Sequence, residues 1–251
     1  MNAKRKASSK DASADFMIVA AHPDDAEIFA GGTALKLRAL GSRGVLVDVS
    51  DGGAGTRGSA AIRAREAAAA AKAMGLSRVC LGESDGRVRD TLEAQWKLIR
   101  EIRRFRPKVV FTHHFAEEHP DHGATALLVK QAVFRAGLKK LDCPGEPFRP
   151  GRIFHAVNSA TSVAPSFCVD ITSHWEAKLS VLRCYESQFH GAGAGKYKGK
   201  TDLATPAFLD ALEVRARFYG QRIRRRYAEA FWCEEIAEVA DPTALGLERF
   251  P

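Results

Sequence analysis

The sequence has no closely spaced cysteines and no long apolar segment. Its 5 cysteines are scattered over 251 residues without a C-x-x-C pair, which is typical of reduced thiols in the core of a cytoplasmic protein. No apolar run is long enough to cross a membrane. The first residues, MNAKRKASSKDASAD, are polar and lack the apolar centre of a signal peptide. We therefore expect a cytoplasmic protein without a membrane partner, and a disordered basic tail at 1–14.

The basic residues are not interleaved with aromatic ones, as they would be in a protein that binds single-stranded nucleic acid. The net charge is +8, from 38 Lys and Arg against 30 Asp and Glu. Much of this excess lies in the tail and in Arg222 to Arg226, near the end of a predicted helix, where solvated cations are common. We expect no nucleic-acid partner, and an anionic small substrate would account for part of the remainder.

Short apolar runs alternate with helical stretches over the first two-thirds of the chain. Strands are predicted at 15–22, 44–50, 78–82, 108–114, 152–158 and 166–172, and helices at 26–41, 59–75, 91–105, 123–136 and from 205 onward. Ser59 and Gly75 fit the two caps of the second helix, and Pro107 ends the third. This order predicts a Rossmann-like α/β fold, a three-layer αβα sandwich with a mostly parallel sheet, in a single domain at 15–251.

Two similar turns follow the first and fourth predicted strands. HPDD occupies 22–25 and HPDH occupies 119–122. Ligands of open α/β sheets bind where strands end at their carboxyl edge, so both turns are expected on one rim. A catalytic zinc prefers three nitrogen or oxygen ligands and keeps one position for water. His22, Asp25 and His122 would supply them, leaving Asp24, His119 and Asp121 for catalysis; His113 and His114 are assigned to ordinary hydrogen bonding.

These motifs resemble those of the zinc-dependent N-acetylglucosamine deacetylases of the LmbE/PIG-L type. The resemblance rests on AHPDD at 21–25 and HPDH at 119–122, and it covers nearly the whole chain after the tail. Three further stretches, GTRGSAAIRAREAAAAAKAMG, PFRPGRIFHAVNSATSVAPSFCVDIT and KLSVLRCYESQF, are similar to the branch that deacetylates N-acetylglucosaminyl malate in bacillithiol biosynthesis.

The resemblance implies a role for each residue of the two motifs. His22, Asp25 and His122 would bind zinc, with iron(II) as the alternative in the cell. Asp24 would be the general base and His119 the general acid, with Asp121 orienting His119. The family also implies a homo-oligomer, often a hexamer.

Other positions that the resemblance concerns lie outside the two motifs. Arg63 and Arg149 match positions where the branch holds its substrate, although an isolated arginine is most often a solvated surface residue. The guanidinium fork suits a carboxylate, and a malate aglycone carries two.

The chain departs from the family just before the second motif. Glu117 stands where other branches have a tyrosine that polarises the acetyl oxygen, and Glu118 replaces an expected basic residue. Tyr197, in the Gly/Lys-rich segment 191–200, is a candidate replacement for that tyrosine. A mobile loop over the site is predicted there.

Three functions remain open from the sequence. The first is a zinc deacetylase of an N-acetylglucosaminyl conjugate, most simply N-acetylglucosaminyl malate. The second is a zinc deacetylase of another N-acyl amino sugar, such as an inositol-linked sugar, chitobiose or an antibiotic intermediate. The third is a basic module without enzyme activity.

Overall fold

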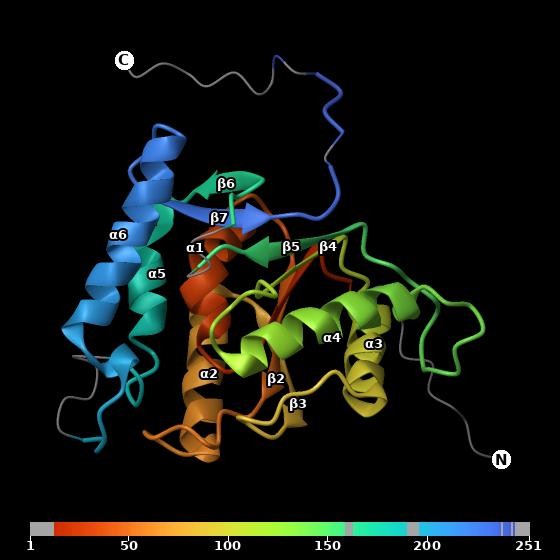
Figure 1. Cartoon of the computed structure of the whole chain (residues 1–251), viewed down its shortest axis with the longest axis horizontal. Coiled ribbons are helices and arrows are strands. Elements are labelled where there is room, and N and C mark those ends of the chain that lie inside the picture. The colour runs from red at the N-terminus through yellow and green to blue at the C-terminus, as the bar shows by residue number, and fades with distance from the viewer. Residues whose placement is uncertain (1–12, 159–162, 190–195, 237, 242, 244–251) are drawn as a thin grey trace.

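Seven strands form one sheet in the order β3-β2-β1-β4-β5-β7-β6 (Figure 1). The structure is a computed structural model that describes residues 13–158, 163–189, 196–236, 238–241 and 243. The strands are β1 (Phe16–Ala20), β2 (Gly44–Ser50), β3 (Ser77–Glu83), β4 (Val109–Thr112), β5 (Arg152–Ala156), β6 (Phe167–Asp170) and β7 (Ala228–Trp232).

The first five strands run parallel, and β1 lies in the middle of them. β1 pairs with β2 on one side and with β4 on the other, both in parallel. Such parallel strands need helical crossovers, which the alternating sequence pattern predicted. β7 is antiparallel to both β5 and β6. The sheet is therefore mostly parallel, as expected.

The sequence analysis did not predict β7. Its sequence, AEAFW, carries Glu229 in the middle of a short run that follows several arginines. Glu229 is nevertheless buried, because its carboxylate accepts hydrogen bonds from the Gly32 and Thr33 amides and pairs with Lys178 at 2.6 Å. Partners nearly 200 residues away in sequence thus make this strand stable, and local patterning does not show them.

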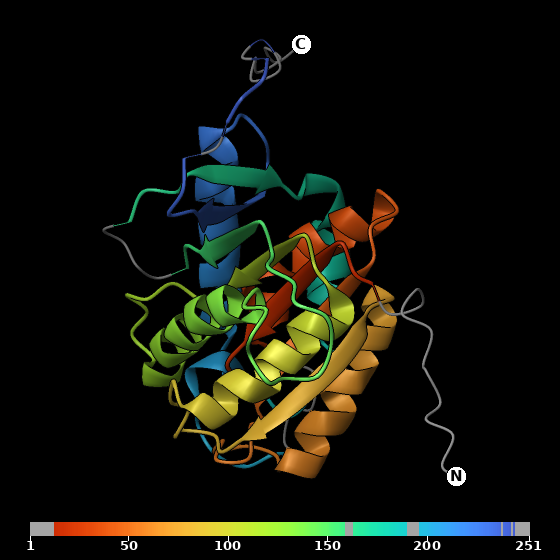
Figure 2. The same ribbon diagram turned by 90° about the vertical axis from the view of Figure 1, so that its right-hand side faces the viewer.

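In the described part of the chain, six α-helices cover the two faces of the sheet. They are α1 (Asp25–Ala39), α2 (Ala60–Met74), α3 (Leu92–Phe105), α4 (Pro120–Ala136), α5 (Trp175–Leu182) and α6 (Pro206–Arg222); two short 3-10 helices are η1 (Thr172–His174) and η2 (Asp202–Ala204). Helices α1, α2 and α5 pack on one face and α3 and α4 on the other, while α6 packs on β7 (Figures 1 and 2). The three-layer αβα prediction is confirmed.

Side chains of β1 point alternately to the two faces of the sheet and contribute to a hydrophobic core on each face. Phe16, Ile18 and Ala20 join the core under α1, α2 and α5, whereas Met17 and Val19 join the core under α3 and α4. Successive strand side chains point to opposite faces, so a strand buried on both faces is apolar throughout. That burial holds the end of β1 in a fixed position.

Both ends of the second helix lie where the sequence predicted them, whereas the fourth helix begins earlier than predicted. Ser59 caps α2 by accepting from the Ile62 amide at 3.4 Å, and Gly75 ends it with φ of 65°. Helix α4 begins at Pro120, three residues before the predicted start, because proline is favoured in a first turn. His122 therefore lies in the first turn of a helix and not in a loop.

The predicted tail and the predicted loop are only partly described. Residues 1–12 of the tail and 190–195, which include the first half of the loop predicted at 191–200, lie outside the described residues. Ala14, inside the predicted tail, is buried and donates its amide to the Phe105 carbonyl at 2.7 Å. Within the described part of the chain, no helix is long and apolar enough to span a membrane.

Candidate active site

The carboxyl ends of β1, β3 and β4 surround a cavity of about 560 Å³. Both H-P-D turns line it, together with Asp85 and Gly86 after β3, residues 54–56 after β2, and Arg63 on α2. Parallel strands that end at one edge bring together segments about 100 residues apart in the chain. The two turns therefore share one rim, as the sequence analysis predicted.

The first turn places its two aspartates in different directions. The backbone of Asp24 has φ of 106°, a conformation that residues other than glycine rarely adopt. Asp25 then begins α1, and its Oδ2 accepts the His22 amide at 2.9 Å and lies 3.0 Å from His22 Nδ1. Such strain at a functional residue is maintained only by surrounding structure, here the buried end of β1 and the start of α1.

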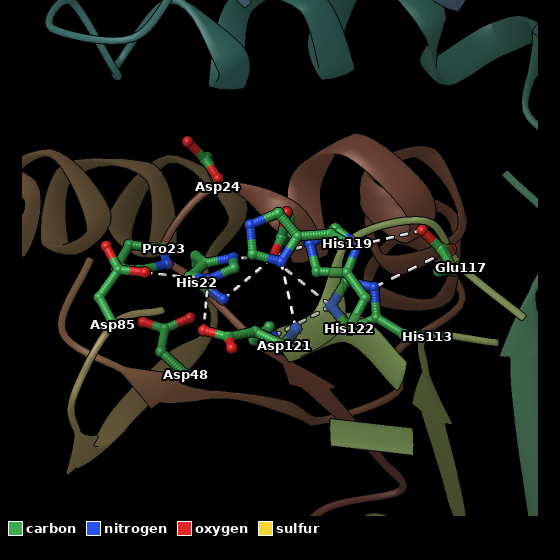
Figure 3. A network of polar contacts seen from close by, with 12 residues as sticks. His22, Pro23, Asp24, Asp48, Asp85, His113, Glu117, His119, Asp121 and His122 are labelled. Atoms are coloured by element: carbon green, nitrogen blue, oxygen red, sulfur yellow. Dashed lines mark hydrogen bonds and ion pairs between the residues drawn. The ribbon is translucent and has the colours of Figure 1, made fainter. Parts of the chain in front are cut away.

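The three predicted metal ligands come together in the structure, and Figure 3 shows two of them, His22 and His122. The potential ligand atoms of His22, Asp25 and His122 all lie within 4.8 Å of one another, and His122 Nε2 is 3.3 Å from Asp25 Oδ2. Two ligands bound to zinc at its usual bond lengths in a tetrahedron lie about 3.4 Å apart. The spacing and the two-nitrogen, one-oxygen donor set therefore fit a divalent cation.

The electrostatics of this set also fit a cation. Burial opposes charge on both imidazoles, but Asp25 and the nearby carboxylates raise the pKa of His22 to about 11 and that of His122 to about 9. Burial likewise opposes ionisation of Asp25, yet His122 and His22 hold its pKa well below the usual range. Without a metal the site thus retains protons, which a bound cation would displace.

Asp24 lies outside this set and contacts Arg63 instead. Arg63 donates to Asp24 Oδ2 at 3.1 Å and to the Pro23 carbonyl. Burial, opposed by Arg63, raises the pKa of Asp24 to about 7, and the neighbouring Asp25 adds to this. A carboxylate with a pKa near neutrality can both take and release a proton.

His119 and Asp121 contact each other differently from the prediction. His119 caps α4, and its Nδ1 accepts the backbone amide of Asp121 at 3.2 Å, so its Nε2 carries the proton in the neutral form. The Asp121 carboxylate instead lies 3.3 Å from His22 Nε2 and accepts the Gly86 amide at 2.8 Å. Burial and the charges of His22 and His122 lower the pKa of His119. Asp121 thus orients His119 through its backbone and His22 through its side chain.

Several residues at the site were not identified as functional from the sequence. Asp85 Oδ1 is 3.1 Å from His22 Nε2, and Glu117 Oε2 is 3.0 Å from His122 Nδ1 (Figure 3). A carboxylate on the second nitrogen of a metal-binding histidine fixes its tautomer. Asp85 follows the end of β3, so the rim argument applied to the third strand would have found it.

His113 is a buried hydrogen-bonding residue, in keeping with its assignment from the sequence. Its Nε2 accepts the Ala21 amide at 3.0 Å, which uses one of its two nitrogens. Its ring also stacks on that of His122 with centroids 3.9 Å apart. His114 is buried too, and its Nδ1 accepts the Ala116 amide at 3.1 Å.

The structure does not bring Arg149 to this site. Its side chain donates to the Phe134 carbonyl at 2.8 Å and lies over the Phe134 ring, near the C-terminal end of α4. The H-P-D turn is at the other end of that helix, roughly 20 Å away at 1.5 Å per residue. Of the two predicted arginines only Arg63 lines the cavity. Tyr197 is likewise absent from the described residues that line it.

Comparisons with known proteins agree with the geometry. Residues 17–133 match the family described as PIG-L: GlcNAc-PI de-N-acetylase. The chain is 30% identical over 221 residues to the diacetylchitobiose deacetylase of Thermococcus kodakarensis, covering 83% of this chain and 78% of that enzyme. It is 26% identical over 278 residues to the 1D-myo-inositol 2-acetamido-2-deoxy-alpha-D-glucopyranoside deacetylase of Nocardiopsis dassonvillei, covering 85% of this chain and 97% of that enzyme.

Among solved structures, the conserved protein TT1542 from Thermus thermophilus is similar over most of its length. The TM-score is 0.80 at 34% identity, with 90% of this chain and 98% of that chain covered. The fold and the site define a de-N-acetylase, an enzyme that hydrolyses an amide. The chain belongs to the PIG-L family, also called LmbE-like.

Proposed function

We propose that the protein is a metal-dependent deacetylase that hydrolyses the N-acetyl amide of an N-acetylglucosaminyl conjugate. The observation that carries this proposal is the juxtaposition of His22, Asp25 and His122 with an Asp24 carboxylate that contacts none of them. Amide hydrolysis needs an activated water, a stabilised oxyanion and a proton for the leaving amine. The cavity offers a group for each.

His22, Asp25 and His122 would hold the metal, zinc or iron(II). When bound, such an ion would lower the pKa of a coordinated water, to about 7 for zinc, and would polarise the acetyl carbonyl. Carboxylates would orient both imidazoles for metal binding. Asp85 and Asp121 contact Nε2 of His22, and Glu117 contacts Nδ1 of His122.

Asp24 and His119 would move the protons. Asp24 takes the proton of the attacking water, and Arg63 keeps its carboxylate in place. His119, whose Nδ1 accepts the Asp121 amide, presents Nε2–H to the oxyanion or to the departing sugar nitrogen. Base and acid come from different turns, so they approach the amide from different sides.

For the substrate we propose N-acetylglucosaminyl malate, as in bacillithiol biosynthesis, on the sequence similarity to that branch. Chitobiose and an inositol-linked N-acetylglucosamine are the alternatives, which the two curated relatives favour through their own substrates. All three share the acetamido sugar and differ in the aglycone. The choice therefore depends on the cavity beyond the sugar.

The test is release of free amine from purified protein. N-acetylglucosaminyl malate, diacetylchitobiose, the inositol conjugate and N-acetylglucosamine would be compared before and after metal removal and zinc reloading. We expect activity on at least one conjugate, lost on metal removal and restored by zinc. A protein that keeps full activity without metal, or releases no amine from any of them, would refute the proposal.

A further inference from the structure

Helix α6 brings a second arginine to the cavity. Among the described residues that line it, Arg63 and Arg215 are the two cations other than histidine. Arg63 is already engaged, since it donates to Asp24 and to the Pro23 carbonyl. Arg215 also lines an adjoining small pocket of about 20 Å³. Arg215 therefore lines the same cavity as the predicted metal ligands and also its extension toward α6.

Arg215 has an incomplete set of partners. It is partly buried, yet no residue that the structure describes lies within hydrogen-bonding or ion-pair distance of its guanidinium. Burial lowers the pKa of Arg215, and the negative charges of Glu117 and Glu229 oppose that effect. A cation that is partly removed from water and has no direct partner costs free energy, part of which a bound anion would recover.

The two acidic residues near Arg215 already have other partners. Glu117 contacts His122 at 3.0 Å and accepts from Asn158 at 3.4 Å. Glu229 pairs with Lys178 at 2.6 Å and accepts two backbone amides of α1. Both carboxylates are held by these partners and do not pair with Arg215. The guanidinium of Arg215 is therefore available to bind a ligand.

Part of the cavity wall that Arg215 shares is apolar. Ile28 and Phe29 of α1, Leu203 of η2 and Phe208 of α6 line the same cavity. Charge-assisted hydrogen bonds are stronger where water is excluded, and a guanidinium binds a carboxylate or phosphate through two parallel hydrogen bonds. A neutral sugar or inositol would cover this arginine without offering it an anion.

We propose that Arg215 is a specificity-determining residue that binds an anionic group, carboxylate or phosphate, on the aglycone of the N-acetylglucosaminyl substrate. This inference rests on the proposed deacetylase function and assigns to α6 the part that sequence similarity gave to Arg149. It predicts a preference for acidic conjugates over chitobiose.

The test compares zinc-loaded wild type with Arg215→Gln, Arg215→Lys and the control Arg222→Gln, which removes an exposed charge from the same helix. Substrates are N-acetylglucosaminyl malate, N-acetylglucosamine 1-phosphate and the neutral methyl glycoside. We expect Arg215→Gln to lower the acidic-to-neutral ratio of kcat/KM by about 10- to 100-fold, mainly through KM. Arg215→Lys should lose part of this ratio, because it keeps the charge but not the fork.

The outcomes separate the anion sources and the competing explanations. A selective loss with malate or with phosphate supports the proposal and identifies the anion. An equal loss on all three substrates, or none, overturns it. Arg222→Gln should leave the ratio unchanged.

A binding measurement keeps this inference separate from the deacetylase proposal. Free malate and inorganic phosphate would each be titrated calorimetrically into zinc-loaded wild type and Arg215→Gln. If no conjugate is deacetylated, the proposed function fails, but binding of either anion at least 10-fold weaker in the variant still supports the anion site. Equal affinity of the two proteins for both anions, or no binding of either anion to either protein, refutes it.

Discussion

Asp24 and Asp25 are neighbours in the chain but lie in different electrostatic environments. Asp25 is placed between His22 and His122, which lower its pKa far below the usual range. Burial raises the pKa of Asp24 to about 7, against the opposing charge of the neighbouring Arg63. The positive φ of Asp24 turns the two carboxylates apart. One backbone conformation thus separates two identical side chains, to which we assign metal binding and proton transfer in the proposed mechanism.

Substitution of each aspartate should separate these two roles. Asp24→Asn should keep the metal and lower kcat by about 10²-fold or more, as expected when a general base is lost. Asp25→Ala should lose metal, because it removes a ligand. Metal content by elemental analysis and turnover by amine release check this. Loss of metal in Asp24→Asn with retention in Asp25→Ala would reverse the assignment.

Glu117 should act on the metal through His122. Its carboxylate lies 3.0 Å from His122 Nδ1, so Glu117→Gln replaces a charged partner of the imidazole by a neutral one. We expect zinc affinity, measured by competition with a chelator, to fall about 10-fold or more. Glu118→Gln is the matched control, because Glu118 is exposed and adjacent. Equal affinity in both variants would contradict this role.

The sequence predicted that the residues of the two H-P-D turns come together, but it did not predict the contacts that support them. His22, Asp25 and His122 occur in short motifs at strand ends, where topology alone brings them together. Asp85 also follows a strand end, where the same argument would have found it, whereas Arg215 has no local motif and only tertiary packing places it at the cavity. For Arg149 the local motif was misleading. It predicted a contact with the substrate, but the side chain contacts the Phe134 carbonyl instead.

At the scale of elements, Arg78 on β3 connects the strands and helices beneath the site. Its guanidinium binds both carboxylate oxygens of Asp48 on β2, at 2.6 and 2.7 Å, and also Glu27 on α1. Tyr185, which follows α5, donates to Glu27 at 2.9 Å. All of these side chains are largely buried. The network therefore fixes α1, which carries Asp25, relative to the sheet.

Arg78→Met should destabilise the fold strongly. It leaves Asp48 and Glu27 buried without their cation, and removal of one partner of a buried pair costs about 3–5 kcal/mol. Lys97→Met is the control, because the pair of Lys97 with Glu83 is partly exposed and worth about 1 kcal/mol or less. Urea unfolding would measure both. Similar small losses in the two variants would show that the network contributes little.

Regular elements were predictable where the signal is local. Residues 44–50 were predicted as a strand and match β2, and both caps of α2 were identified, because alternation and capping depend on near neighbours. β7 was missed because its polar residue is stabilised by Lys178 and α1. The antiparallel edge of the sheet thus depends on contacts that sequence periodicity does not encode.

At the scale of the whole molecule, the three predicted metal ligands come from the ends of two adjacent strands. His22 and Asp25 follow β1, whereas His122 follows β4, about 100 residues later, and the two strands pair in parallel. An unfolded chain does not hold these side chains together, so a metal that binds them binds the folded state. Its binding free energy is then added to the free energy of unfolding.

Metal removal should therefore lower the melting temperature. A ligand at 100 times its Kd stabilises the folded state by about 2.7 kcal/mol, and each kcal/mol corresponds to about 2–4 °C in a protein of this size. We expect Tm to fall by about 5–11 °C on chelation and to recover with zinc, as measured by calorimetry. Asp25→Ala, which lacks a ligand, should show little response to either treatment, whereas Asp24→Asn should respond like wild type. A wild-type Tm that is insensitive to metal, or an equal response in Asp25→Ala, would mean that the ion binds elsewhere and that β1 and β4 are joined by packing alone.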